Sequence, residues 1–290
     1  MEINNNSRKK VGLALSGGFI RAASQIGVIE ALEENNIPID MVAGCSSGAA
    51  VAAAYSAGKL EKLKERLLKG KRREYWQVIF EPGLPKTGFL KGEKNRRFFE
   101  EFVGDKTFDQ LDKKTFLAAT DLKNMNECII SSGQVGQAIQ ACTAVPGIFA
   151  PVEIDHKILV DGVNFNAIPS KVLYQNGADY VIAVDVTQTP GIVIRIISKI
   201  KNKFGLIKPI CSNKNNCDRL SIIRAILRAA NLSSSLIDGF NHSSYPYNIL
   251  IKPKIEHVKR WHVSLVKDCI EEGRKAALEA VPQIKKDLGL

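Results

Sequence analysis

Two consecutive strand-turn-helix units at residues 11–58 constrain the fold of this chain more than any other stretch. The segment reads VGLALSGGFIRAASQIGVIEALEENNIPIDMVAGCSSGAAVAAAYSAG. Short apolar runs at Val11–Ser16 and Asp40–Ala43 are each followed by a glycine-containing turn and then by a helix-forming segment. Strands that alternate with helices predict a mostly parallel sheet that is covered by helices on both faces.

The second turn has the sequence GxSxG, with Ser46 between Gly44 and Gly48. Between a strand and an alanine-rich helix, this pattern is typical of a nucleophile elbow. The serine then occupies a strained turn, and the flanking glycines lack Cβ atoms that would clash in so tight a bend. Ser46 would also lie at the head of a helix, where N–H groups favour negative charge. We therefore predict that Ser46 is a nucleophile.

The first turn contains Gly17 and Gly18, which follow the first strand and precede a helix that is entered at Arg21. An enzyme that attacks an ester must stabilise the oxyanion of a tetrahedral intermediate, and backbone N–H groups of such a turn can do so. A phosphate-binding loop would require GxGxxG or GxxxxGK[ST], and neither pattern occurs here. The turn is therefore predicted to form an oxyanion hole.

These motifs resemble those of the patatin-like phospholipase family, specifically its short bacterial members. That family has a glycine-rich oxyanion turn followed by Arg or Lys, a GxSxG serine, and an aspartate in a DG[GA] motif. The corresponding residues here are Gly17 and Gly18 with Arg21, Ser46, and Asp161 in the sequence Asp161-Gly162-Val163. The resemblance also covers AATDL (118–122), VPGIFAPVEID (145–155) and GADYVIAVDV (177–186). It spans about residues 10–187, and more loosely the C-terminal helix.

The resemblance implies a three-layer α/β/α fold with a mostly parallel central sheet. It also implies a Ser46–Asp161 dyad, an oxyanion hole at Gly17, Gly18 and Arg21, a lipid or acyl-ester substrate, and no metal or organic cofactor. An isolated Asp-Gly pair would more simply be a turn, but beside the other two motifs we favour a general base. A Ser-His-Asp triad that uses His242 or His262 stays open as an alternative.

Three positions depart from the family pattern. Phe19 stands where the family has a third glycine of the oxyanion turn, Ala22 replaces the glycine after the arginine, and Val163 replaces the second glycine of DGG. Phe19 enters positive φ less readily than glycine, so we expect a reshaped loop. An alternative function is therefore a catalytically eroded protein of the same fold that associates with membranes or acts as a regulator.

Composition predicts one domain over residues 1–290. With 290 residues and 45% apolar composition, the chain can bury a full core. We expect a core at about 10–187, a basic amphipathic segment at about 192–214 and C-terminal helices at about 217–288. Residues 263–286 are predicted to form a helix that is kinked or broken at Pro282.

The formal net charge of +11 predicts a surface that attracts anions. No nucleic-acid-binding motif accompanies the charge, so nucleic acid is not an expected partner. Residues 192–208 belong to a run with six basic residues and no acid between Arg195 and Lys214, which is typical of a segment that lies on anionic bilayers. A helix packed on the sheet fits the same pattern equally well, and an esterase or thioesterase acting on soluble substrates is the corresponding functional alternative.

The sequence favours a cytoplasmic location, with peripheral attachment to the inner face of the membrane as an option. The N-terminus MEINNNSRKK lacks the pattern of a signal peptide. Uncharged runs at 41–58 and 128–152 are interrupted by Gly, Ser, Gln or Pro, so neither is predicted to span a bilayer. The six cysteines show no CxxC spacing and are predicted to be reduced thiols. The sequence does not indicate an oligomeric state.

Overall fold

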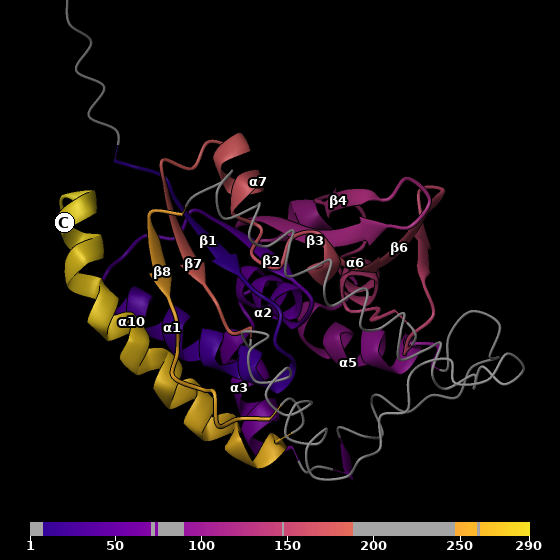
Figure 1. Cartoon of the computed structure of the whole chain (residues 1–290), viewed down its shortest axis with the longest axis horizontal. Helices are drawn as coiled ribbons and strands as arrows, with labels where there is room; N and C mark the ends of the chain where they lie inside the picture. The colour runs from indigo at the N-terminus through magenta and orange to yellow at the C-terminus, as the bar shows by residue number, and fades with distance from the viewer. Residues whose placement is uncertain (1–7, 71–72, 75–89, 147, 188–246, 260–261) are drawn as a thin grey trace, which may run out of the picture.

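The computed structural model describes residues 8–70, 73–74, 90–146, 148–187, 247–259 and 262–290 (Figure 1). The basic segment at 192–214 and a helix expected at 220–237 lie outside these residues. The described residues contain one eight-stranded sheet. Its strands are β1 (Val11–Leu15), β2 (Met41–Cys45), β3 (Lys114–Asp121), β4 (Asn126–Ile130), β5 (Val152–Ile154), β6 (Lys157–Asp161), β7 (Tyr180–Val184) and β8 (Ile249–Ile251).

The sheet is mostly parallel, as the sequence predicts. Its order is β5-β6-β3-β2-β1-β7-β8, and β4 pairs with β3 outside this path. The strands from β3 to β8 along this path are all parallel. Strands β4, β5 and β6 form the antiparallel part. Because β1 and β2 are neighbours, the turns that follow them meet at the same edge of the sheet.

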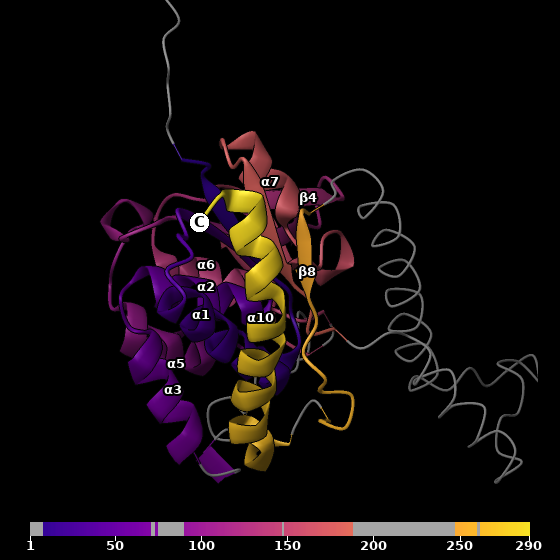
Figure 2. The same cartoon turned by 90° about the vertical axis from the view of Figure 1, so that its left-hand side faces the viewer.

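Helices cover both faces of this sheet, which gives the predicted three layers (Figures 1 and 2). The α-helices are α1 (Ala23–Glu34), α2 (Ser47–Ser56), α3 (Leu60–Lys69), α5 (Glu93–Val103), α6 (Val135–Cys142), α7 (Ser170–Gln175) and α10 (Val266–Leu288). Leu13 and Leu15 of β1 belong to the larger core cluster, which α1 and α2 share. Ala14 of the same strand belongs to a second cluster that contains Val172 and Leu173 of α7. The alternation along β1 therefore assigns its side chains to opposite layers.

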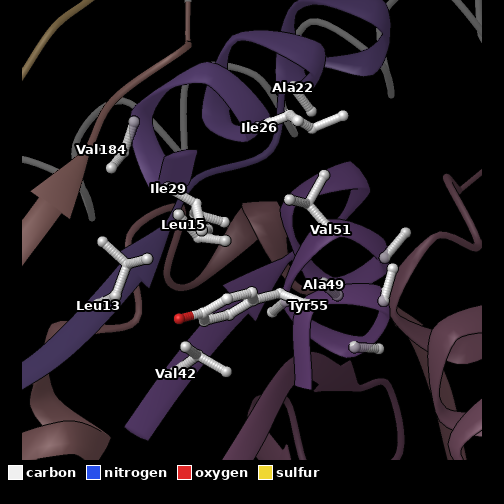
Figure 3. Close-up of a cluster of buried hydrophobic side chains, with 14 of the residues drawn as sticks. Leu13, Leu15, Ala22, Ile26, Ile29, Val42, Ala49, Val51, Tyr55 and Val184 are labelled. Carbon is white, nitrogen blue, oxygen red and sulfur yellow. The ribbon is translucent and has the colours of Figure 1, made fainter. Parts of the chain in front are cut away.

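Helix α2 is buried on nearly all sides, which explains its alanine content. The residues Ala49, Ala52 and Ala53 are fully buried between the sheet and the neighbouring helices. Figure 3 shows part of this core, in which Leu13 and Leu15 of β1 lie close to residues of α1 and α2. Burying each leucine contributes about 1.5–3 kcal/mol, so the packing fixes α2 and the turn that precedes it.

The C-terminal helix α10 lies along α1, at the outside of the helical layer (Figures 1 and 2). The prediction of a break at Pro282 is wrong, because the helix continues through that residue to Leu288. Proline removes only one backbone donor, and the buried side chains of Val281 and Ile284 hold this part of the helix against the core. None of the helices in the described part of the chain is long and apolar enough to cross a membrane.

Candidate active site

Ser46 lies between the end of β2 and the first residue of α2. Its backbone has φ 53° and ψ −127°, a conformation that a serine rarely adopts. The two flanking glycines are required by close packing. A Cβ on Gly44 would lie 2.5 Å from the carbonyl oxygen of Gly48, and one on Gly48 would lie 2.5 Å from those of Leu15 and Ser16. The predicted elbow geometry is therefore present, with the serine at the N-terminal end of a helix.

Asp161 is the last residue of β6, which pairs with β3 so that Asp161 lies opposite Ala119. Ser46 Oγ donates a hydrogen bond of 2.6 Å to Asp161 Oδ2. The other carboxylate oxygen, Oδ1, accepts a 3.0 Å hydrogen bond from the backbone N–H of Val163. Asp161 is 1% exposed and Ser46 is 9% exposed. The structure thus joins two side chains that are 115 residues apart in the sequence, and it fixes the orientation of the carboxylate.

The Gly17–Gly18 turn contacts this pair from the end of β1. A Cβ on Gly17 would lie 2.7 Å from Ser46 Cβ and 3.4 Å from Ser46 Oγ, so only glycine allows the turn to approach the serine so closely. The N–H of Gly18 donates a 2.9 Å hydrogen bond to Ser47 Oγ. Ser47 is the unspecified residue of GxSxG, and no sequence pattern singles it out.

Arg21 is 2% exposed and lies below this turn rather than in solvent. Its Nε donates to the carbonyl oxygen of Val258 at 3.0 Å, and its Nη1 donates to that of Val186 at 3.3 Å. The guanidinium therefore ties the helical turn η1 (Phe19–Ala22) to the chain that follows β7 and to the chain that follows β8. These contacts describe an arginine that holds the loop in place.

Ser16 and Gln25 extend this support, and neither was predicted. Ser16 Oγ accepts a 2.8 Å hydrogen bond from the N–H of Val186, and Gln25 Nε2 donates a 2.6 Å hydrogen bond to the carbonyl oxygen of Ser16. Both side chains are fully buried. Buried polar groups require partners, so these contacts fix the end of β1 from which Gly17 starts. Polar residues inside an apolar strand-helix unit were the signal available in the sequence.

The three departures from the family pattern have different backbone conformations. Phe19 adopts φ 54°, so it takes the left-handed conformation that a glycine would take. Ala22 has a helical backbone with φ −60°. Val163 lies in the helical turn η3 (Gly162–Asn164), where its N–H serves Asp161 as any residue could. The backbone of Phe19 is therefore strained, and the reshaping of the loop relative to the family stays a prediction.

Other candidate residues lie elsewhere. His156 is in the turn between β5 and β6 and has φ 61°, whereas His262 precedes α10 and His242 is outside the described residues. Asp121 at the end of β3 accepts hydrogen bonds from the N–H of Lys123 and from Asn124 Nδ2, so its carboxylate supports the turn after β3. Within the described part of the chain, no three His, Cys, Asp or Glu side chains are grouped as a metal ion would require.

The four described cysteines, Cys45, Cys128, Cys142 and Cys269, are free thiols and buried. Burial, together with the Asp161 carboxylate, raises the pKa of Cys142. Burial also raises the pKa of Cys269 to about 11. Both thiols therefore remain protonated at neutral pH and are poor nucleophiles. The remaining two, Cys211 and Cys217, lie outside the described residues.

Comparison with known proteins shows the family of this chain. The family model of patatin-like phospholipases matches residues 13–174, which is more than half of the chain. The chain belongs to the patatin-like phospholipase family. An uncharacterised NTE family protein of Mycobacterium bovis is 31% identical over 186 residues, which cover 64% of this chain and 51% of that protein.

Further relatives extend the comparison. A lysophospholipase NTE1 of the yeast Meyerozyma guilliermondii is 29% identical over 188 residues, which cover 62% of this chain and 13% of the yeast protein. The chain thus spans about half the length of the mycobacterial relatives that it matches, and much less of the yeast protein. Among solved structures, VipD from Legionella pneumophila matches with a TM-score of 0.58 and 12% identity, covering 96% of this chain and 67% of VipD. That similarity supports the fold.

Proposed function

We propose that this chain is a serine lipid acyl hydrolase, a phospholipase A-like esterase that uses Ser46 and Asp161 as a catalytic dyad. The observation that carries the proposal is the 2.6 Å hydrogen bond from Ser46 Oγ to Asp161 Oδ2 on a strained elbow. Membership of the patatin-like phospholipase family supports a lipid substrate, as does the name lysophospholipase given to the yeast relatives.

The reaction follows from the positions of these groups. Ser46 Oγ forms a bond to the carbonyl carbon of the ester while its proton moves to the Asp161 carboxylate. The carbonyl π electrons move to the oxygen, which becomes an oxyanion beside the Gly17–Gly18 turn. When the intermediate collapses, the leaving alcohol takes the proton from Asp161. Water then attacks the acyl-enzyme by the same steps and releases the fatty acid and Ser46.

Two rival functions make different predictions. An eroded site, with Phe19, Ala22 and Val163 in place of the family's glycines, predicts a Ser46 that does not react. An esterase or thioesterase for soluble substrates predicts the same Ser46 chemistry without preference for lipid. The dyad is therefore tested first, and the substrate class second.

The test is labelling with a fluorescent fluorophosphonate, which reacts only with an activated serine. We expect labelling of the wild-type chain, none of Ser46→Ala, and a rate lower by about 10²–10⁴-fold in Asp161→Asn, as for the loss of a general base. The matched control is Asp121→Asn. Asp121 is also 1% exposed, and its carboxylate also accepts the N–H of the residue two positions on.

The control separates chemistry from folding. Asp121→Asn should label at the wild-type rate, because Asp121 supports a turn and does not contact Ser46 in our mechanism. Folded wild-type protein that stays unlabelled would contradict the catalytic proposal and favour the eroded site. Hydrolysis of micellar phospholipid, compared with a short soluble ester, then distinguishes a lipid hydrolase from the esterase for soluble substrates.

A further inference from the structure

The side chain next to the nucleophile already occupies the oxyanion turn. Gly18, one of the two glycines expected to hold the oxyanion, donates its N–H to Ser47 Oγ at 2.9 Å. Ser47 is the first residue of α2 and is partly exposed, whereas Ser46 is buried before it. The hydroxyl of Ser47 therefore lies where the N–H of the turn is directed.

The same turn also contacts Ser46. The distance of 3.4 Å from a Cβ position on Gly17 to Ser46 Oγ shows that the turn lies beside the attacking oxygen. An ester carbonyl carbon bonded to Ser46 Oγ would place its oxygen within reach of this turn. The Gly17–Gly18 segment is thus in contact with both serines.

The hydrogen-bonding capacity of Ser47 is only partly used. A hydroxyl has one donor and two acceptor sites, and the N–H of Gly18 uses one acceptor site. In the part of the chain that the structure describes, the Ser47 hydroxyl donates its proton to no other group, so this proton is available to a ligand. A hydroxyl that accepts an N–H hydrogen bond is polarised and becomes a stronger donor.

We propose that the Ser47 hydroxyl is a catalytic oxyanion donor, which relays the N–H of Gly18 to the negatively charged oxygen of the intermediate. This inference rests on the proposed serine hydrolase function. The proton of Ser47 stays on its oxygen throughout and forms only a hydrogen bond. The proton that leaves Ser46 goes to Asp161, and the new negative charge on the former carbonyl oxygen is the acceptor for Ser47.

In the competing arrangement, the Ser47 hydroxyl accepts the N–H of Gly18 only while no substrate is bound. In that arrangement Ser47 turns away when the oxyanion forms, and the N–H of Gly18 binds the oxyanion directly. Removal of the hydroxyl would then leave the turnover number unchanged or raise it. The two arrangements therefore predict opposite effects of one substitution.

The experiment compares Ser47→Ala, Ser47→Thr and Ser47→Cys with the wild-type chain on a soluble ester, with folding checked by thermal unfolding. We expect Ser47→Ala to lower kcat by about 10²-fold, the loss typical of one oxyanion donor. KM should change little, because the interaction strengthens only in the transition state. Threonine, which keeps the hydroxyl, should restore most of kcat, and cysteine, a weak donor, should give an intermediate value.

A pair of inhibitors reports on the oxyanion itself. A trifluoromethyl ketone forms a tetrahedral oxyanion on Ser46, and the methyl ketone of the same chain length serves as its non-covalent partner. Ser47→Ala should weaken the trifluoromethyl ketone by about the factor seen in kcat, and should leave the methyl ketone unchanged. The matched control is Ser56→Ala at the other end of α2, where Ser56 Oγ accepts a 2.7 Å hydrogen bond from Thr115 Oγ1. It should alter stability without changing the ratio of the two inhibitors.

The outcomes separate this inference from the function on which it rests. Wild-type protein that neither labels with fluorophosphonate nor hydrolyses any ester would reject both. Normal labelling of wild type with an unchanged or raised kcat in Ser47→Ala would reject the relay alone. A threonine variant that is folded and as slow as the alanine variant would also reject it, because the hydroxyl would not be the group that matters.

Discussion

Two residues at the site adopt backbone conformations that normally belong to glycine. Ser46 has φ 53° and Phe19 has φ 54°, and each conformation costs of order 1–3 kcal/mol for a residue with a side chain. Strain at Ser46 presents its hydroxyl to Asp161, so the cost has a chemical reason. Strain at Phe19 lies in the helical turn that follows Gly17 and Gly18.

The strain at Phe19 can be measured by comparing two variants that both lack the ring. Phe19→Ala retains the strained left-handed backbone, whereas Phe19→Gly relieves it. We expect the glycine variant to have the larger free energy of unfolding, by about 1–2 kcal/mol. Urea denaturation of both variants gives the difference.

The control for Phe19 is its neighbour Ile20, which lies in the same helical turn and is not among the residues with positive φ. There Ile20→Ala should be more stable than Ile20→Gly by about 0.5–1 kcal/mol. If Phe19→Ala were more stable than Phe19→Gly, the positive φ of Phe19 would be contradicted. The loop would then follow a different backbone path at this residue.

At this scale the sequence predicted some features and could not predict others. Gly44 and Gly48 identified Ser46, because glycine spacing records a local steric need. The pairing of Ser46 with Asp161 was implied only by the family resemblance, because it depends on the pairing of β6 with β3, which no local pattern encodes. The role of Ser47 could not be predicted from the sequence, because any residue satisfies that position of GxSxG. Its importance arises only from the direction of the Gly18 N–H.

At the scale of elements, the closest contact in the helical layer is the crossing of α1 and α10. A Cβ on Gly273 would lie 1.8 Å from the carbonyl oxygen of Ser24, and one on Gly27 would lie 2.0 Å from that of Ile270. The bidentate ion pair between Arg274 and Glu34 lies at the same crossing. Arg21 lies just before α1 and supports the oxyanion turn. The packing of α10 on α1 therefore helps to hold that turn in position.

We predict that Gly273→Ala destabilises the protein by about 2 kcal/mol or more, since the helices must separate to admit the methyl group. Helix propensity alone predicts the opposite, a gain of about 1 kcal/mol from replacing glycine by alanine. The sign of the change in the free energy of unfolding therefore distinguishes the steric clash from the effect of helix propensity. Glu271, an exposed position of α10, provides the control, where Glu271→Ala should be more stable than Glu271→Gly.

Combining the two glycine positions sharpens this prediction. Gly27→Ala and Gly273→Ala push apart the same pair of helices, so the double variant should lose less stability than the sum of the two single losses. Strict additivity would indicate two independent local adjustments and would contradict a rigid crossing. The sequence predicted a C-terminal amphipathic helix. It could not predict what Gly273 contacts, because that contact depends on how α10 lies on α1.

At the scale of the whole molecule, charge is the property that composition predicts most directly. The net charge of +11 is present wherever the basic residues lie, and it favours anionic surfaces in general. Residues 192–208 concentrate five of these charges, at Arg195, Lys199, Lys201, Lys203 and Lys208, among isoleucines and a phenylalanine. We propose that this segment, which lies outside the described residues, provides the membrane contact of a lipid hydrolase.

We predict that the chain co-sediments with vesicles containing phosphatidylserine at low salt, and that binding is lost as salt rises, because surface charges are then screened. Each basic residue near such a surface contributes about 1 kcal/mol. Replacing the five basic residues of 192–208 by glutamine should therefore abolish binding at moderate salt.

The matched control removes five exposed lysines elsewhere, at positions 254, 259, 267, 275 and 286, and so reaches the same net charge. If both variants lost binding equally, overall charge would be the cause and the segment would have no special role. If both still bound, the segment would be rejected as the membrane contact. If the wild-type chain ignored anionic lipid, membrane binding itself would be rejected and a soluble ester would become the better substrate.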